Sequence, residues 1–224
     1  MGLIEVEHPA EGVALFTLNR PERRNALSTE LREEGNAVLA ELAGDDGVRA
    51  LVVTGAGTTF SAGFDLREFE VAAGDEDFGR RLWASSDEWH RRWLGFPVPT
   101  VAAVNGPAIA GGFDVAVMCD LRVVAEGATF AHPEIAFGDV VYGPLHDLVG
   151  GAVARDLCFT GRRIDGPEAA RLGLATRLVP DGRTRDEAVA LATAVAGSPR
   201  DVLVRTKAKA VRRADVAPGG TLDL

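Results

Sequence analysis

The stretch from Asn105 to Asp120, NGPAIAGGFDVAVMCD, constrains the fold more than any other part of the chain. It completes the apolar run TVAAVNG, which is typical of a buried strand, and continues into an apolar helix with Gly111 and Gly112 at its start. Glycine weakens a helix interior by about 1 kcal/mol relative to alanine, so this pair indicates a backbone that another group approaches closely. Asp114 follows among apolar residues, where a carboxylate needs a partner or a chemical role.

Short apolar strands and amphipathic helices alternate along the rest of the chain. Strands are expected at 3–8, 12–19, 48–55, 100–106, 121–126, 129–134 and 176–180. Helices are expected after the N-cap Ser28, across 65–94 with a mobile break at 71–79, from Gly111 to about Met118, around Pro167, and in the basic segment from 205, with fraying after about Ala217. Strands alternating with helices predict an α/β architecture, in which Trp83, Trp89 and Trp93 pack into the core or a lid.

Composition excludes several classes of protein. A chain of 224 residues that is 46% hydrophobic and 25% charged fits one large globular domain. A net charge of -9 argues against a general nucleic-acid binder, and no apolar run approaches the roughly 18 residues that span a membrane. The N-terminus does not resemble a signal peptide, and Cys119 and Cys158 lie in apolar surroundings, so we expect a cytoplasmic protein with reduced thiols.

The common catalytic motifs do not match. The loop TGAGTTF lacks the third glycine of a dinucleotide-binding turn, and the chain contains no phosphate-binding loop, C-x-x-C or H-E-x-x-H pattern. We therefore expect no bound metal. The SAGFD loop also lacks the G-x-S-x-G arrangement of a serine hydrolase.

Two glycine-rich turns and two acids remain as candidates for a site. The turns SAGFDL and AGGFD each end a strand region and open a helix, so each can present a peptide N–H to an anionic oxygen. The alternative is that both are ordinary turns and Asp114 is a helix cap. Glu134 lies 20 residues after Asp114, and taken by itself it is better interpreted as a solvated loop carboxylate. For His132 a structural or surface role is expected rather than a catalytic one.

Over most of its length the sequence resembles the enoyl-CoA hydratase/isomerase, or crotonase, superfamily. The resemblance is carried by LNRPERRNALS, LVVTGAGTTFSAGFDLREF, TVAAVNGPAIAGGFDVAVMCDLRVVAEGATFAHPEIAFG and FTGRRIDGPEAARLGLATRLVP. It implies a fold of repeated ββα units in two roughly perpendicular sheets with peripheral helices, assembled as trimers or pairs of trimers. It also implies an acyl-CoA thioester as substrate, with no cofactor beyond the coenzyme A that the substrate carries. The expected division is a catalytic core at 1–197 and a shortened helical segment at 198–224.

The resemblance assigns roles to individual residues. The peptide N–H groups of Phe64 and Gly111 would form the oxyanion hole, and side chains at Gly111 and Gly112 would obstruct the thioester. Asp114 would activate the water that adds at C3, and Glu134 would exchange the proton at C2. The coenzyme A contacts would come from Arg24, Ala62, Leu66 and Arg67, although solvated arginines are an equal alternative.

Two departures from the family pattern keep the activity open. Hydratases usually have glutamate where this chain has Asp114, so the carboxylate is one methylene shorter. Some dienoyl-CoA isomerases of the family pair aspartate with glutamate, but they add a further aspartate where this chain has Tyr142. The segment after Gly138 is also shorter than usual, so Asp139, Tyr142 and His146 are expected to shape the acyl pocket.

Three functions therefore remain as alternatives. The first is hydration of a 2-enoyl-CoA, and the second is isomerisation of an enoyl-CoA or dienoyl-CoA in which Glu134 alone moves a proton. The third is a non-catalytic acyl-CoA-binding subunit. Decarboxylation and thioester hydrolysis are lesser options, because one fold supports many reactions.

Overall fold

The computed structural model describes residues 2–216 and Thr221. The fraying expected after Ala217 falls on 217–220 and 222–224, outside the described residues. The strands are β1 (Ile4–Ala10), β2 (Val13–Leu18), β3 (Ala50–Gly55), β4 (Thr100–Val104), β5 (Ala108–Ile109), β6 (Leu121–Ala125), β7 (Thr129–Ala131), β8 (Ile164–Asp165) and β9 (Arg177–Val179). The helices are α1 (Thr29–Gly44), α2 (Leu66–Gly74), α3 (Glu76–Leu94), α4 (Gly111–Met118), α5 (Gly143–Thr160), α6 (Gly166–Arg171), α7 (Thr184–Ala196) and α8 (Arg200–Ala214), with short 3-10 helices η1 (Pro21–Arg23) and η2 (Pro133–Ala136).

Two sheets organise the molecule, which confirms the predicted α/β class. The larger sheet has the strand order β1-β2-β3-β4-β6-β9, and all its pairs are parallel except β1 with β2. The smaller sheet has the order β5-β7-β8. Every residue of β2, β3 and β4 is buried, because helices cover both faces of this part of the large sheet.

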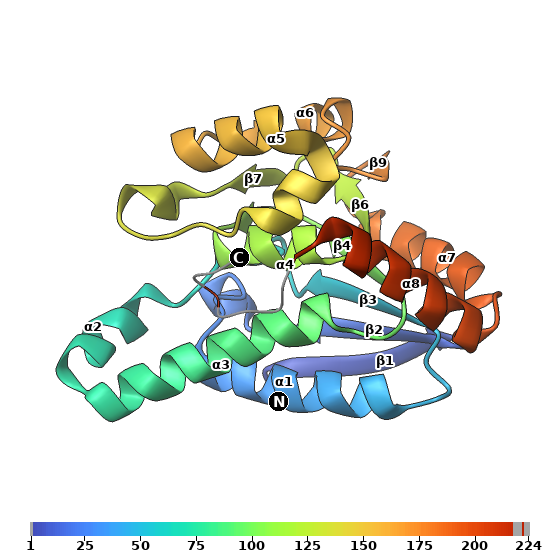
Figure 1. Ribbon diagram of the computed structural model, residues 1–224, viewed down its shortest axis with the longest axis horizontal. Helices are drawn as coiled ribbons and strands as arrows, with labels where there is room; N and C mark the ends of the chain where they lie inside the picture. Colours follow the sequence, from blue (N-terminus) through green and yellow to red (C-terminus); the bar gives the residue numbers. More distant parts are fainter. Residues whose placement is uncertain (1, 217–220, 222–224) are drawn as a thin grey trace.

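Each face of the large sheet has its own apolar core. On one face Phe16 packs against Trp89 and Trp93 of α3, with ring centroids 6.2 and 5.5 Å apart. On the other face α7 packs its buried alanines against residues of β2, β3 and β4 (Figure 1). The expectation for the tryptophans is therefore confirmed for Trp89 and Trp93, whereas Trp83 is 38% exposed and contacts Phe69.

Three boundaries differ from those expected. The basic helix expected from 205 begins at Arg200, directly after its N-cap Pro199, as α8. The strand expected over 129–134 ends at Ala131, because Pro133 has no N–H for a strand ladder and instead begins η2. The broad break expected at 71–79 is the single residue Asp75, whose N–H donates to the Val71 carbonyl and whose side chain caps α3 at Phe78. The chain thus turns between α2 and α3 within one residue.

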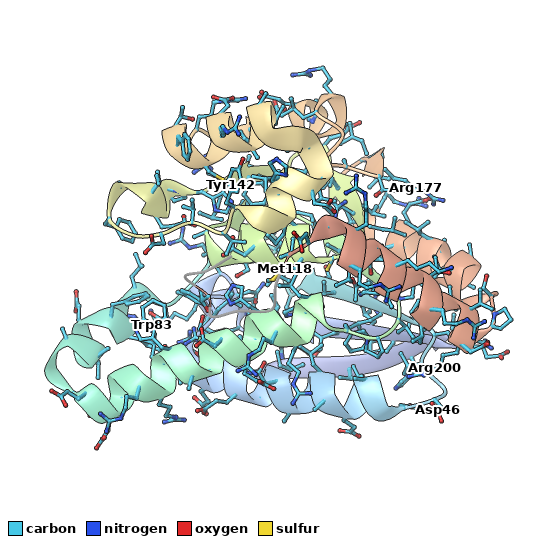
Figure 2. All side chains as sticks on the ribbon, viewed as in Figure 1. Asp46, Trp83, Met118, Tyr142, Arg177 and Arg200 are labelled. Carbon is cyan, nitrogen blue, oxygen red and sulfur yellow. The ribbon has the colours of Figure 1, made fainter. Side chains whose placement is uncertain are left out.

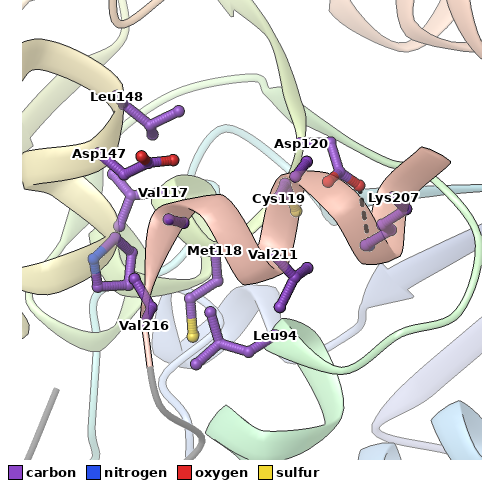
Figure 3. A pocket seen from close by; sticks show the side chains of 13 residues that line it. Leu94, Val117, Met118, Cys119, Asp120, Asp147, Leu148, Lys207, Val211 and Val216 are labelled. Atoms are coloured by element: carbon purple, nitrogen blue, oxygen red, sulfur yellow. Dashed lines mark ion pairs between the residues drawn. The ribbon is translucent and has the colours of Figure 1, made fainter.

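Helix α4 lies at the centre of the molecule and all its residues are buried. It follows β5 directly and packs against α3, α5 and β4. Helix α8 is held by Arg200, which pairs with Asp46 at 3.4 Å, and by Lys207, whose Nζ lies 2.8 Å from Asp120 (Figures 2 and 3). Within the described residues no helix combines the length and apolar character needed to cross a membrane.

Candidate functional site

The two glycine-rich turns identified in the sequence lie side by side. Ser61 pairs with Ala108 in an isolated bridge, and the Ile109 N–H donates to the Ser61 carbonyl at 2.9 Å. Gly63 has φ +82°, and a Cβ there would lie 2.8 Å from the Cβ of Ala110. The close approach of the turns therefore depends on Gly63, which the sequence analysis did not single out.

The peptide N–H groups of Phe64 and Gly111 are free to act as donors at this junction. The chain before Phe64 is held by the Leu27 N–H, which donates to the Gly63 carbonyl at 2.8 Å. Neither the Phe64 nor the Gly111 N–H has a backbone acceptor in the part of the chain that the structure describes. Ala110 has φ +51° and ψ -128°, which is a strained backbone for a non-glycine residue. This strain directly precedes Gly111 and fixes the start of α4.

A side chain would have different consequences at Gly112 and at Gly111. A Cβ on Gly112 would lie 2.5 Å from the Ser61 carbonyl oxygen, so packing inside the protein demands a glycine there. A Cβ on Gly111 would contact Leu27 at 3.4 Å and Phe64 at 3.6 Å, which are ordinary distances. The interpretation that both glycines clear a path for a ligand is therefore wrong for Gly112. For Gly111 the protein itself places no such demand.

Asp114 and Glu134 lie close together, although different elements carry them. Asp114 is in the first turn of α4 and Glu134 is in η2, and both side chains are largely buried. His132 lies between them: its Nδ1 is 2.8 Å from Glu134 Oε1 and 3.7 Å from Asp114 Oδ1. The solvated-loop alternative for Glu134 is therefore excluded.

His132 is a member of this cluster that sequence reasoning assigned to a structural role. It is fully buried, and its ring stacks on Phe113 at a centroid distance of 4.5 Å. Burial opposes its positive charge, but the hydrogen bond to Glu134 and the charges of Asp114 and Glu134 outweigh burial and raise the pKa of His132. Its only sequence signal was its place two residues before Glu134.

The charges of Asp114 and Glu134 also affect the pKa of a neighbouring thiol, Cys158. Burial is the largest cause that raises the pKa of Cys158 to about 11, and the charges of Asp114 and Glu134 add to it. Both cysteines are free and buried, so the expectation of reduced thiols in apolar surroundings agrees with the structure.

The same three side chains are the only described group that could surround a cation. One donor atom each of Asp114, His132 and Glu134 lies within 4.8 Å of the others. However, His132 Nδ1 and Glu134 Oε1 already form a hydrogen bond with each other. A cation bound between them would have to replace that bond, so the donor set fits a hydrogen-bonded His132–Glu134 pair beside Asp114 better than a metal site.

The residues expected to contact coenzyme A lie around the first turn. Arg24 is exposed, Ala62 is half-buried and donates its N–H to the Arg24 carbonyl, and Leu66 is 61% exposed. Arg67 is not free, because its Nε and Nη2 bond to Asp65 at 3.0 and 2.9 Å.

Asp65 joins Arg67 to a second arginine that sequence reasoning did not select. Arg20 Nη1 contacts the same carboxylate at 2.9 Å. Hydrogen bonding to Arg67 is the largest cause that lowers the pKa of Asp65 to about 2, despite partial burial, and Arg20 adds to it.

The residues expected to shape an acyl pocket are spread along one segment. Asp139 and His146 are exposed, whereas Tyr142 is half-buried, and the rings of Tyr142 and His146 lie 5.5 Å apart. The structure does not bring Asp139 or His146 to the acids through any described hydrogen bond or ion pair.

A cavity of about 230 Å³ lies between α3, α4, α5 and α8 (Figure 3). Leu94 and Met118, which line it, stand one helical turn beyond His90 on α3 and Asp114 on α4. Its lining also includes Asp120 and Lys207, which pair with each other. The cavity therefore adjoins the acid cluster rather than containing it.

The fold and this arrangement define the class of protein. Two free peptide donors beside a buried pair of acids form a site suited to stabilising an enolate-like oxygen while protons move nearby. Residues 8–220 match the family described as enoyl-CoA hydratase/isomerase, and the chain belongs to that family.

Individual relatives agree with this assignment. A Thermus thermophilus protein that carries the name of an enoyl-CoA hydratase is 44% identical over 87% of this chain and 79% of its own length. The hydroxycinnamoyl-CoA hydratase-lyase of Pseudomonas fluorescens is 37% identical over 84% of this chain and 70% of its own. A crystal structure of an enoyl-CoA hydratase/isomerase from Xanthobacter autotrophicus has a TM-score of 0.86 at 34% identity, and the match covers 95% of this chain and 80% of that one.

Proposed function

We propose that the protein hydrates a 2-enoyl-CoA to a 3-hydroxyacyl-CoA. The observation that carries this proposal is the meeting of Asp114 and Glu134 beside the unpaired N–H groups of Phe64 and Gly111. A thioester oxygen between the two donors would gain negative charge as water adds, and each such donor contributes about 3–4 kcal/mol. The reaction needs no cofactor besides the coenzyme A of the substrate.

The two carboxyl groups have distinct roles in this proposal. Asp114 takes a proton from the water that adds at C3, and Glu134 gives a proton to C2. His132 holds Glu134 Oε1, whereas Glu134 Oε2 is buried without a hydrogen-bond partner among the described residues, so Oε2 is the oxygen available to carry the proton. Positioned acid and base groups of this kind contribute about 10² to 10⁴ in rate.

Double-bond isomerisation is the second candidate. It is favoured by the direct hydrogen bond of His132 to Glu134 alone, which prepares one carboxyl group to move a proton between C2 and C4. Asp114 would then serve as a charge near the thioester rather than as a base for water. This reaction would add no solvent oxygen to the product.

Incubation with crotonyl-CoA in H₂¹⁸O, followed by mass spectrometry of the product, tests the proposal. We expect ¹⁸O in a 3-hydroxyacyl product, and we expect Glu134→Gln and Asp114→Asn each to lower the rate by about 10²-fold or more. A loss of no more than twofold in Glu134→Gln would contradict its role. Turnover of 3-enoyl or dienoyl thioesters without label would support isomerisation, and thioester binding without any turnover would support a non-catalytic subunit.

We also propose that coenzyme A is held near Arg24, Ala62, Leu66 and Arg67. Arg24 is exposed, and its carbonyl accepts from the Ala62 N–H at 3.0 Å, so these two expected contacts lie on adjoining turns.

We further propose that the chain forms trimers or pairs of trimers. Phe137 and Phe159 are 71% and 70% exposed near the packed ends of η2 and α5, as expected for a surface covered by another copy. Sedimentation equilibrium measures the assembly, and a monomer at all concentrations would contradict it.

A further inference from the structure

His90 approaches Asp114 from α3. Its side chain is buried, and its ring packs edge-on against Phe64, with centroids 6.4 Å apart. Nε2 of His90 lies 3.9 Å from Asp114 Oδ2, whereas Asp114 Oδ1 lies 3.7 Å from His132. Each oxygen of the Asp114 carboxylate therefore faces a different imidazole.

The hydrogen bonds of His90 define which ring nitrogen carries hydrogen. Nδ1 lies 2.8 Å from the Ser86 carbonyl oxygen, which can only accept, so Nδ1 is a donor. Thr221 Oγ1 lies 3.1 Å from the same nitrogen and 2.7 Å from Ser86 Oγ. In the neutral ring Nε2 is then an acceptor, and it is buried without a hydrogen-bond partner among the described residues.

We propose that His90 Nε2 and Asp114 Oδ2 together hold the water that adds to the substrate. This inference rests on the proposed hydratase function. A separation of 3.9 Å is too long for a direct hydrogen bond, but one water can bond to both atoms at ordinary lengths of about 2.8 Å. Because both acceptors take its hydrogens, the lone pairs of that water stay free to attack carbon.

The pair compensates for the short side chain of Asp114. The aspartate carboxylate is one methylene closer to its backbone than a glutamate carboxylate would be, so it has less reach to orient water alone. His90 supplies a second acceptor on a rigid helix, held in orientation by Ser86. Positioning of this kind determines whether a water lies close enough to react.

The addition of water conserves atoms, protons and electrons with the groups named above. The water oxygen forms a bond to C3, one water O–H bond breaks, and that proton passes to Asp114. The second hydrogen stays on the oxygen as the product hydroxyl and remains bonded to His90. The electrons of the C2–C3 double bond move to the thioester oxygen and return as C2 takes a proton from Glu134. Solvent exchange then returns the proton from Asp114 to Glu134.

The test separates water addition from proton exchange at C2. Hydration of crotonyl-CoA is measured beside deuterium exchange at C2 of butyryl-CoA in D₂O, which needs the enolate and Glu134 but no added water. We expect His90→Asn, which retains a donor to Ser86 and lacks the Nε2 acceptor, to lower kcat for hydration about 10²-fold. We expect the rate of deuterium exchange at C2 to stay within about threefold of wild type, because Glu134 is the positioned base that this exchange uses.

Further variants control for a structural role. His90→Gln restores an acceptor near the Nε2 position and should recover much of the hydration. His8→Asn changes an exposed histidine on β1 and should match wild type in both assays. If His90→Asn does not fold, His90→Leu keeps the apolar contact with Phe64 and tests the same difference between loss of hydration and retention of exchange.

Hydration by His90→Asn within threefold of wild type would overturn the inference, and so would an equal loss of hydration and exchange in a folded variant. Failure of wild type itself to incorporate ¹⁸O would instead reject the proposed function, together with the inference that rests on it. The two failures are therefore distinguishable.

Discussion

At the scale of single residues, the site combines glycines with different tasks and histidines with different partners. Gly63 and Gly112 let two turns meet, and Gly111 leaves its N–H and the space beside it open. His132 bonds to Glu134, and His90 faces Asp114. Adjacent or chemically similar residues thus respond differently to substitution.

The two neighbouring glycines give a paired prediction. Gly112→Ala should lower the free energy of unfolding by about 1–3 kcal/mol, because the added Cβ meets the Ser61 backbone. Gly111→Ala should unfold close to wild type yet hydrate crotonyl-CoA poorly, since its Cβ occupies the space beside the N–H. Urea unfolding and steady-state hydration compare the two. Equal stability of both variants would contradict the distinction.

His132 predicts a pH dependence of stability. The folded state raises its pKa, so its contribution is fully present below the unfolded value of about 6.5 and is lost as pH rises through the folded value. Asp114 and Glu134 are the charged groups that face it, and Cys158 is a neutral thiol nearby. Urea unfolding of wild type and His132→Gln should show the largest difference at low pH. A difference that grows with pH would contradict this.

At the scale of elements, helix starts and turns place the functional groups. Ser28 begins α1 by accepting from the Leu31 N–H, as the sequence predicted, and Asp65 begins α2 by accepting from the Arg67 N–H. Asp65 also binds Arg20, which precedes η1. One carboxylate therefore caps a helix and ties it to a distant turn beside the expected coenzyme A contacts.

Asp65→Asn separates these two functions, because asparagine keeps a cap acceptor and loses the charge. We expect a loss of about 1–2 kcal/mol at neutral pH, discounted for the exposure of Arg67. The lowered pKa of about 2 means that the stabilisation is present above about pH 4 and is lost as pH falls toward 2. Urea unfolding at neutral pH and near pH 3 tests it. A difference in the free energy of unfolding that is the same at both pH values would argue against a contribution from the ion pairs of Asp65.

At the scale of the whole molecule, α8 borders the cavity next to the acids. Lys207 is 7% exposed, and its Nζ contacts the Val98 carbonyl at 3.1 Å as well as Asp120. Asp120 in turn accepts from the N–H and the hydroxyl of Thr100 at the start of β4. This network joins the last helix to the central sheet.

Lys207→Ala should therefore lower the free energy of unfolding by about 1–3 kcal/mol, because it leaves Asp120 partly buried without its cation. Lys209→Ala, at an exposed position of the same helix, is the matched control. A double-mutant cycle of Lys207→Ala with Asp120→Ala measures the coupling. Additive losses from the two substitutions would show that the pair is not coupled.

The sequence by itself determined the α/β class, the buried strands, the starts of α1, α4 and α6, and the two turns that carry the candidate donors. These features are local, because periodicity, capping residues and glycine act over a few positions. It also selected Asp114 and Glu134 as candidates, and a family resemblance assigned their expected roles. The strand boundary at Ala131 and the reason for Gly112 were not correctly predicted, since each depends on a neighbour brought in by folding.

Only the tertiary structure decided how the site is completed. The approach of His132 to Asp114, the approach of His90 to Asp114 and the pairing of Arg20 with Asp65 join residues on separate elements. Burial then sets the strength of these contacts, because charges removed from water interact more strongly. Sequence periodicity carries no record of such distances, so a histidine among core tryptophans gave no sign that it faces the buried carboxylate of Asp114.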